Sequence, residues 1–216
     1  MPRRQGKEYM NMQSTIEAIP FVKNNAPLAA SEQIAVIEHH FRKIMLALGL
    51  NVEDDSLKDT PLRVAKMFVN ESFMGLNPLN EPSVTLFENK FRYNEIVLER
   101  DIPLYSYCEH HFVPIIGKAH IAYISKGQVI GLSKLNRIVH YYSKRPQVQE
   151  RLTVQVAEHL KAVMDIEDVA VVVEAEHLCV AARGVNDTGC STLTTSMHGQ
   201  FHTEARSRQL FAMLAI

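Results

Sequence analysis

The chain has 216 residues, of which 46% are hydrophobic and 22% are charged, and its formal net charge is −1 when its ten histidines are neutral. A chain of this length buries roughly 70% of the surface that it exposes when unfolded, so its fold needs no disulfide. The balanced charge argues against general nucleic-acid binding, and no apolar run approaches the ~20 residues of a membrane span.

The N-terminal stretch begins with basic residues but lacks the apolar region of a secretory signal. Three cysteines, Cys108, Cys179 and Cys190, are few and odd in number, which is typical of a reducing compartment where cysteines bind metal, react or pack. We therefore expect a cytoplasmic protein with no membrane and no nucleic-acid partner.

The first 80 residues contain a polar arm followed by helices. Residues 1–28 are polar and mixed in charge and predict a flexible or partner-dependent arm. From Ser31 apolar residues recur at helical spacing, and a second helix is predicted from Thr60, with Pro61 in its first turn. We therefore expect an N-terminal helical segment over residues 29–80.

The remainder, residues 81–216, alternates strands and helices. Two helices, GLSKLNRIVHYYSKR and PQVQERLTVQVAEHLKAVM, interrupt the strands, and a short helix over Glu204 to Leu214 ends the chain. The predicted strands share β-branched and aromatic residues: SVTLFENKF, EIVLERDIPLYSY, FVPIIGKAHIAYIS, DVAVVVEAEHLCVAA and CSTLTTSMHG. This order predicts an α+β domain built on an antiparallel sheet.

Cysteine and histidine occur at metal-ligand spacing in the stretch CEHHF. Cys108 and His111 are three residues apart, but an isolated C-x-x-H pair is more often a buried thiol beside a surface histidine. Cys179 is the best third candidate, with a packed core cysteine as its alternative. If the three converge, two thiolates and one imidazole suit zinc and leave a fourth position for water, as in catalytic sites. Cys190 is interpreted as a free thiol.

Each of these segments carries one more histidine. His110 precedes the proposed ligand His111, and in an extended backbone the two side chains diverge. His177 lies two residues before Cys179 and would share its side of a strand. Imidazole titrates near neutral pH, so both are candidates for general acid–base catalysis. A hydrogen-bonded structural histidine is the alternative for either one.

Cations and a helix start indicate an anion site. Ser133, Lys134 and Arg137 open a helix after Gly131, where free backbone N–H groups favour phosphate. Arg183, Lys66 and Arg63 add positive charge, although cations at a helix start are usually only solvated.

Gln149 and Glu150 lie at the start of the helix that follows Pro146. A carboxylate accepts two hydrogen bonds from an N–H/NH2 edge such as that of guanine, and an amide can add to the recognition. The alternative is an ordinary contact with the helix dipole.

Taken together, these motifs strongly resemble the GTP cyclohydrolase I family. The resemblance is carried by CEHHFVPIIGKAHIAYI, VIGLSKLNRIVHYYSKRPQVQERLT and VVVEAEHLCVAARG, and extends from about Asp59 to the C-terminus. It implies a tunnelling-fold (T-fold) domain with an added helical part. It also implies a homo-oligomeric ring, commonly a decamer of two stacked pentamers with active sites at subunit interfaces, to which a regulatory protein could bind.

The resemblance further implies conversion of GTP and water to 7,8-dihydroneopterin triphosphate and formate, the first step of folate or tetrahydrobiopterin synthesis. By motif, Cys108, His111 and Cys179 match the zinc ligands, and His110 and His177 match the catalytic histidines. Gln149 and Glu150 match guanine-recognising residues. The positions around the triphosphate are matched by Lys66, Ser133, Lys134, Arg137 and Arg183, with Arg63 near them.

Other functions predict other residues. A zinc nucleobase deaminase needs H-x-E with P-C-x-x-C, and the chain has no C-x-x-C. A related T-fold enzyme such as 6-pyruvoyltetrahydropterin synthase would be expected to use three histidines for zinc. A zinc-stabilised T-fold scaffold would need neither His110 nor His177. A partial enzyme would stop at the ring-opened formamidopyrimidine, which the presence of both histidines argues against.

Overall fold

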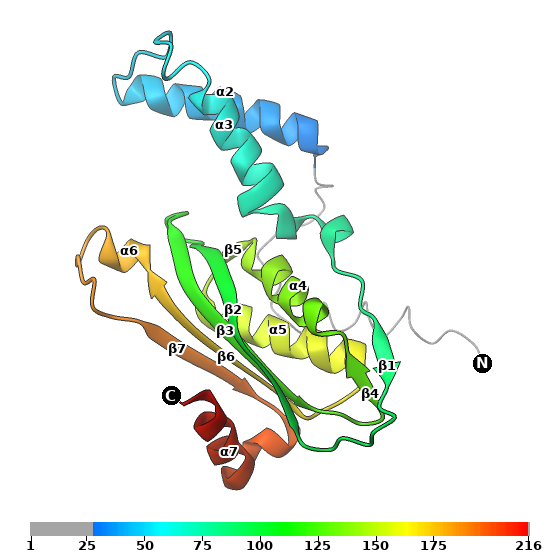
Figure 1. Cartoon of the computed structure of the whole chain (residues 1–216). Helices are drawn as coiled ribbons and strands as arrows, with labels where there is room; N and C mark the ends of the chain where they lie inside the picture. The colour runs from blue at the N-terminus through cyan, green and yellow to red at the C-terminus, as the bar shows by residue number, and fades with distance from the viewer. Residues whose placement is uncertain (1–27, 216) are drawn as a thin grey trace.

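The computed structural model describes residues 28–215, so the arm predicted over residues 1–28 lies, except for Leu28, outside the described residues. The described chain is helical at first and mixed afterwards (Figure 1). In chain order the elements are α2 (Ala30–Ala47), α3 (Thr60–Met67), the π-helix η1 (Phe68–Ser72), the 3-10 helices η2 (Met74–Leu76) and η3 (Pro78–Asn80), β1 (Leu86–Glu88), β2 (Ile96–Cys108), β3 (Pro114–Ile124), β4 (Gln128–Ile130), α4 (Leu132–Ser143), β5 (Pro146–Gln147), α5 (Gln149–Met164), β6 (Val169–His177), α6 (Leu178–Ala181), β7 (Thr192–Met197), the 3-10 helix η4 (Gly199–His202) and α7 (Glu204–Leu214).

Five strands form the main sheet in the order β5-β2-β3-β6-β7, and every neighbouring pair is antiparallel except β2 with the two-residue β5. The register pairs Tyr107 with Pro114 and Ile115 with His177. The end of β2, the start of β3 and the end of β6 therefore meet at one end of the sheet. The short β1 pairs with β4 in a second, two-stranded sheet.

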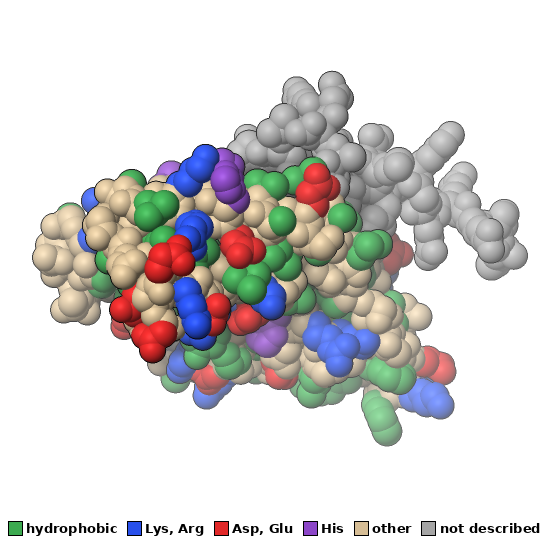
Figure 2. All heavy atoms as spheres, turned by 90° about the horizontal axis from the view of Figure 1, so that it is seen from above, with side chains coloured by type: hydrophobic (Ala, Val, Ile, Leu, Met, Phe, Trp, Pro, Cys, Tyr) green, Lys and Arg blue, Asp and Glu red, His purple; other side chains and the backbone are tan. Residues whose placement is uncertain are grey.

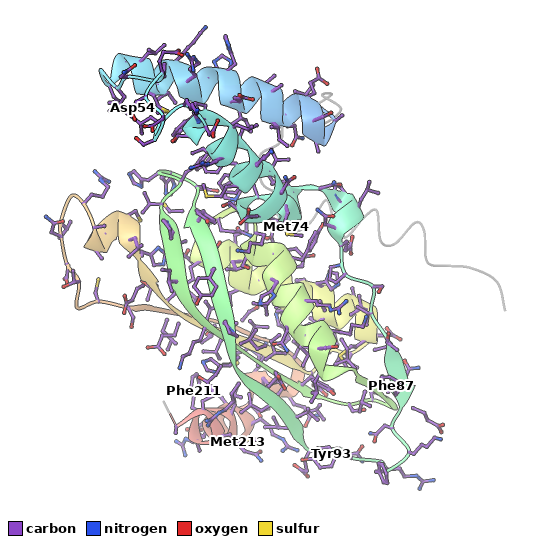
Figure 3. The ribbon with its side chains drawn as sticks, turned by 45° about the horizontal axis from the view of Figure 1, so that its top comes forward. Asp54, Met74, Phe87, Tyr93, Phe211 and Met213 are labelled. Atoms are coloured by element: carbon purple, nitrogen blue, oxygen red, sulfur yellow. The ribbon has the colours of Figure 1, made fainter. Side chains whose placement is uncertain are left out.

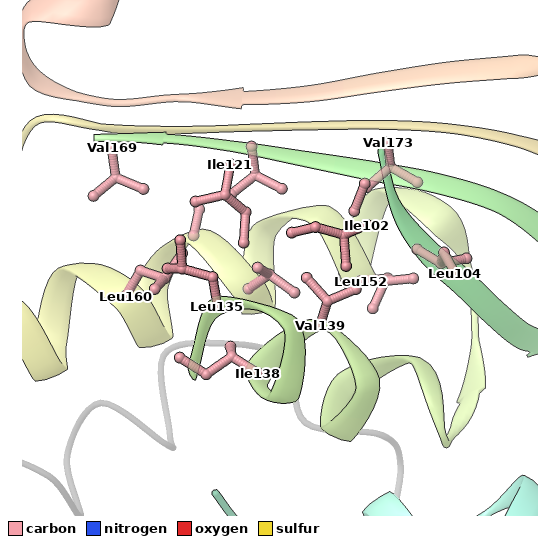
Figure 4. Close-up of a cluster of buried hydrophobic side chains, with 14 of the residues drawn as sticks. Ile102, Leu104, Ile121, Leu135, Ile138, Val139, Leu152, Leu160, Val169 and Val173 are labelled. Atoms are coloured by element: carbon pink, nitrogen blue, oxygen red, sulfur yellow. The ribbon is translucent and has the colours of Figure 1, made fainter. Parts of the chain in front are cut away.

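Helices α4 and α5 cover one face of the main sheet (Figure 1). Leu152, Val156 and Leu160 recur every four residues along α5 and are at most 1% exposed, because this stripe faces the sheet. Figure 4 shows Leu152 and Leu160 in the core with Ile121 and Val173 of the sheet. Burying each such side chain contributes about 1.5–3 kcal/mol, so this layer stabilises the packing of α5 on the sheet.

Part of the opposite face is covered by the C-terminal helix α7. Leu210 and Leu214 of α7 are buried with Phe201 against strand residues that alternate with those of the first core. Phe211 packs at the edge of this cluster, on the helix seen beneath the sheet in Figure 3.

The hairpin of α2 and α3 stands away from the sheet (Figure 1). Met45 is the buried residue of α2, whereas the large apolar side chains exposed on and just after this helix include Val36, Ile44, Leu46, Leu48 and Leu50. Seen from above, this side shows hydrophobic side chains interspersed with charges of both signs (Figure 2).

Gly75 marks the point where the helical part meets the end of α4. Its N–H donates to the Lys144 carbonyl at 2.9 Å, and Arg145 Nε donates to the Gly75 carbonyl at 2.8 Å. A Cβ at position 75 would lie 2.0 Å from the Tyr141 carbonyl oxygen, so only glycine permits this approach.

The predicted α+β class with an antiparallel sheet is confirmed, including the final helix over Glu204–Leu214. Two local predictions are wrong. The helix expected at Pro146 begins at Gln149, because Pro146 and Gln147 pair with the end of β2. Cys179 is not on a strand: β6 ends at His177, and Cys179 lies in the single helical turn α6.

The division into a helical segment over residues 29–80 and a T-fold domain over 81–216 stays a prediction. Within residues 28–215, no helix has both the length and the apolar character needed to cross a membrane.

Candidate active site

Cys108, His111 and Cys179 converge at the end of the sheet. Their ligand atoms all lie within 4.8 Å of one another, and Cys108 Sγ is 3.7 Å from His111 Nδ1. The three come from the end of β2, the turn after it and the helical turn after β6. The pairing of β3 with both strands brings them together across 71 residues of chain.

A tight turn, and not an extended backbone, separates His110 from His111. The Phe112 N–H donates to the Cys108 carbonyl at 2.8 Å, and Phe112 has a φ of 53°, in the left-handed region. The rings of Phe73 and Phe112 are 5.0 Å apart, so an aromatic contact from the N-terminal segment supports the turn. The imidazoles still diverge, with centroids 6.3 Å apart and planes at 71°.

The Cys179 thiol resists ionisation without a cation. Burial, with the neighbouring Cys108 thiol, raises the pKa of the Cys179 thiol above its ordinary value. A bound dication reverses this effect and deprotonates coordinating thiols. The donor set of two sulfurs and one imidazole nitrogen fits zinc.

Arg183 contacts His111, one of the three candidate metal ligands. Its Nη1 lies 2.9 Å from His111 Nε2. A guanidinium only donates hydrogen bonds, so His111 Nε2 is the acceptor here. The predicted cation Arg183 therefore lies beside the candidate metal ligands.

His110 is exposed at the edge of this cluster and is flanked by an ion pair. Its side chain is 64% exposed, with Nδ1 3.6 Å from Cys108 Sγ and Nε2 3.8 Å from Glu109 Oε1. The other Glu109 oxygen is ion-paired with Arg151, which is only 14% exposed and also donates to Gln147 Oε1 at 2.9 Å. The sequence alone does not point to Arg151, because nothing in its local spacing links it to Glu109, 42 residues earlier.

His177 is half-buried and contacts the start of α5. Its Nε2 lies 2.8 Å from Gln149 Oε1, and the Gln149 side chain is in the interior, 1% exposed. Burial lowers the pKa of His177, and the Glu150 carboxylate partly opposes this shift. Glu150 itself is exposed.

The helix start predicted to bind phosphate lies elsewhere. Ser133, Lys134 and Arg137 are at the beginning of α4, next to β4, whereas α4 ends close to β5 and Cys108 (Figure 1). A helix of 12 residues is about 18 Å long. One subunit therefore separates this group from the cysteine–histidine cluster by about the length of α4.

The predicted cations Lys66 and Arg63 lie on α3 and are exposed. Arg63 is within 3.6 Å of the Asp59 carboxylate. Within residues 28–215, no hydrogen bond or ion pair joins either side chain to the cluster.

Comparison with known proteins gives a consistent result. A family model described as GTP cyclohydrolase I matches residues 37–215. The GTP cyclohydrolase 1 of Flavobacterium johnsoniae is 49% identical over 190 residues, covering 88% of this chain and 85% of that protein. That of Aeromonas hydrophila subsp. hydrophila is 48% identical over 209 residues, covering 95% of each chain. That of Erwinia tasmaniensis is 52% identical over 176 residues, covering 82% of this chain and 80% of that protein.

Proposed function

The chain belongs to the GTP cyclohydrolase I family, and from this premise we propose that it hydrolyses the imidazole ring of GTP. The ring carbon C8 leaves as formate, and the remainder rearranges and closes to 7,8-dihydroneopterin triphosphate. One observation carries the proposal: Cys108, His111 and Cys179 converge within 4.8 Å, with His110 and His177 beside them.

Zinc is the proposed cofactor, held by Cys108, His111 and Cys179. Zinc supplies a Lewis acid that lowers the pKa of bound water towards ~7. With a metal held by His111 through either nitrogen, Nε2 would be metal-bound or protonated and would no longer accept from Arg183. Arg183 would then be free to pair with an anion.

The two histidines carry the proton transfers. Opening the imidazole ring requires a proton on a ring nitrogen, and opening the ribose requires one on its ring oxygen. His110 Nδ1 is 3.6 Å from Cys108 Sγ, and His177 precedes Cys179 by two residues, so we assign both histidines to a purine held against the cysteine pair. Glu109 keeps a carboxylate beside His110.

Glu150 recognises the guanine edge, because its exposed carboxylate accepts from an N–H and an NH2 group together. The triphosphate is assigned to the Ser133 hydroxyl and to five cations: Lys66, Arg63, Lys134, Arg137 and Arg183.

The cations of α4 complete the site only from another copy of the chain, because they lie about one α4 length from their own cluster. We therefore infer a homo-oligomer with interfacial active sites, as a decamer of two pentamers. We place the enzyme in the cytoplasm, at the first step of folate or tetrahydrobiopterin synthesis.

The decisive experiment incubates zinc-loaded protein with GTP and follows formate and oxidised, fluorescent pterin together. We expect both products in equal amounts. Absence of formate would contradict the proposed hydrolysis of GTP. Formate without pterin would identify a partial enzyme that stops at the ring-opened formamidopyrimidine.

Substitution of Glu150 tests the guanine assignment. Glu150→Ala removes a charged hydrogen-bond acceptor, which is worth about 1.5–3 kcal/mol or roughly 10- to 100-fold in kcat/KM for GTP. Because Glu150 is exposed, the urea unfolding midpoint should not change. If the loss in kcat/KM were accompanied by a clear drop in the urea unfolding midpoint, the assignment would be contradicted.

A further inference from the structure

The Gln149 side chain has hydrogen-bond partners at both ends of its amide, although it is buried. Its Nε2 is 3.0 Å from the Val173 carbonyl oxygen, 2.9 Å from that of Thr192 and 3.1 Å from Thr194 Oγ1. Its Oε1 is 2.8 Å from His177 Nε2. Little of this amide is left to contact a base.

The surroundings fix which way the amide points. Backbone carbonyl oxygens only accept hydrogen bonds, so the NH2 end must face Val173 and Thr192. A flipped amide would place Oε1 against both carbonyls with no proton between them. The oxygen of Gln149 therefore points at His177.

The hydroxyls nearby are consistent with this orientation. Thr153 Oγ1 donates to the Gln149 carbonyl at 2.8 Å and is 2.7 Å from Thr194 Oγ1. Its single proton is used, so Thr194 is the donor between the two hydroxyls. The lone pairs of Thr194 then remain free to accept from Gln149 Nε2.

The orientation of the Gln149 amide determines which nitrogen of His177 carries the proton. Because Gln149 Oε1 can only accept, His177 Nε2 must carry the proton of this hydrogen bond. In the neutral ring, Nδ1 then holds the lone pair. The protein interior thus selects one tautomer and one orientation of this imidazole.

We propose that Gln149 is a positioning residue that fixes His177 with Nδ1 as its proton-accepting atom, and that it does not read guanine. This inference rests on the proposed function, in which His177 moves protons on the substrate. It replaces the guanine-recognising role that the resemblance implies for Gln149 and leaves Glu150 in that role. It also assigns Nδ1 as the atom of His177 that meets the substrate.

The first test measures the tautomer without using activity. Solid-state NMR of zinc-loaded, 15N-histidine-labelled protein distinguishes protonated from bare ring nitrogens, and comparison with His177→Asn assigns the signals. We expect a protonated Nε2 and a bare Nδ1 at His177. A proton on Nδ1 would overturn the proposal.

The second test separates positioning from base recognition. Gln149→Met fills the space without a polar atom, and should lower kcat by about 10- to 100-fold, as loss of a partner that orients a functional imidazole does elsewhere, with KM for GTP nearly unchanged. Gln149→Glu keeps an oxygen facing His177 and should recover part of kcat. A raised KM with unchanged kcat in Gln149→Met would refute positioning and support guanine reading.

Thr194→Val is the matched control. It removes one partner of the amide but leaves both carbonyls that set its direction, so kcat should stay within about threefold and the tautomer unchanged. A loss as large as that of Gln149→Met would mean that the network acts only structurally, and would overturn the proposal. If the wild-type protein makes neither formate nor pterin, the proposed function fails, whereas the tautomer measurement still decides the role of Gln149.

Discussion

The two histidine-bearing segments of the candidate site are held in different ways. The ring of His177 hydrogen-bonds to an interior amide that is 1% exposed and joined to β6 and β7. His110 lies on a turn and is 64% exposed, and the carboxylate 3.8 Å from its Nε2 is already paired with Arg151.

The difference shows two means of fixing a side chain. An interior hydrogen bond sets the tautomer and the orientation in the folded monomer, whereas a partly exposed ion pair sets mainly the local charge. We therefore expect His177 to be preorganised, and His110 to depend more on substrate or a neighbouring subunit for its final position.

The largest expected effect tests whether both segments share one metal. Cys108→Ser and Cys179→Ser should each release zinc and lower turnover on the order of a thousandfold, because a metal supplies several kcal/mol of transition-state stabilisation. Elemental analysis and GTP turnover measure both effects. Cys190→Ser, at an exposed thiol, is the control and should retain zinc and activity. Zinc retained after loss of either Cys108 or Cys179 would break the link between the segments.

Removing each histidine is the next test. His110→Ala and His177→Ala should each lower kcat by about 10²- to 10⁴-fold, the range for general acid–base groups. Their stabilities should differ. His177→Ala leaves the buried Gln149 oxygen without its donor and should cost about 1–3 kcal/mol of unfolding free energy, whereas the exposed His110→Ala should cost little.

Urea denaturation measures this difference in stability. Equal unfolding free energies for the two variants would show that the Gln149 contact does not hold His177 in the folded protein. The contrast between a preorganised and an exposed histidine would then be lost.

The smallest effect concerns the ion pair beside His110. Arg151→Met leaves the Glu109 carboxylate without its ion-pair partner. It should lower kcat by about tenfold, the smaller of the losses in activity that follow when residues orienting an active-site group are removed. Arg208→Met breaks an ion pair in which both side chains are more than three-quarters exposed, and should change neither kcat nor stability. The same loss in both variants would remove any special role for Arg151.

Much of the fold could be predicted because it depends on local patterns. The apolar stripe of α5 and the alternation of β6 follow from side-chain periodicity, so the α+β class and the bounds of α7 were confirmed. The helix start at Pro146 and the strand position of Cys179 were wrong, because each depends on which strand ends pair. No local pattern contains that pairing.

The sequence by itself determined the chemistry of this protein: two thiols, adjacent histidines and their motifs identify the family and a donor set that suits zinc. Only the tertiary structure decided which groups meet. It placed the Gln149 amide against His177, joined Arg151 to Glu109, and separated the cations of α4 from the cluster. The physical reason is that residue spacing dictates helices and strands, whereas strand register and helix packing set contacts between residues far apart in the chain.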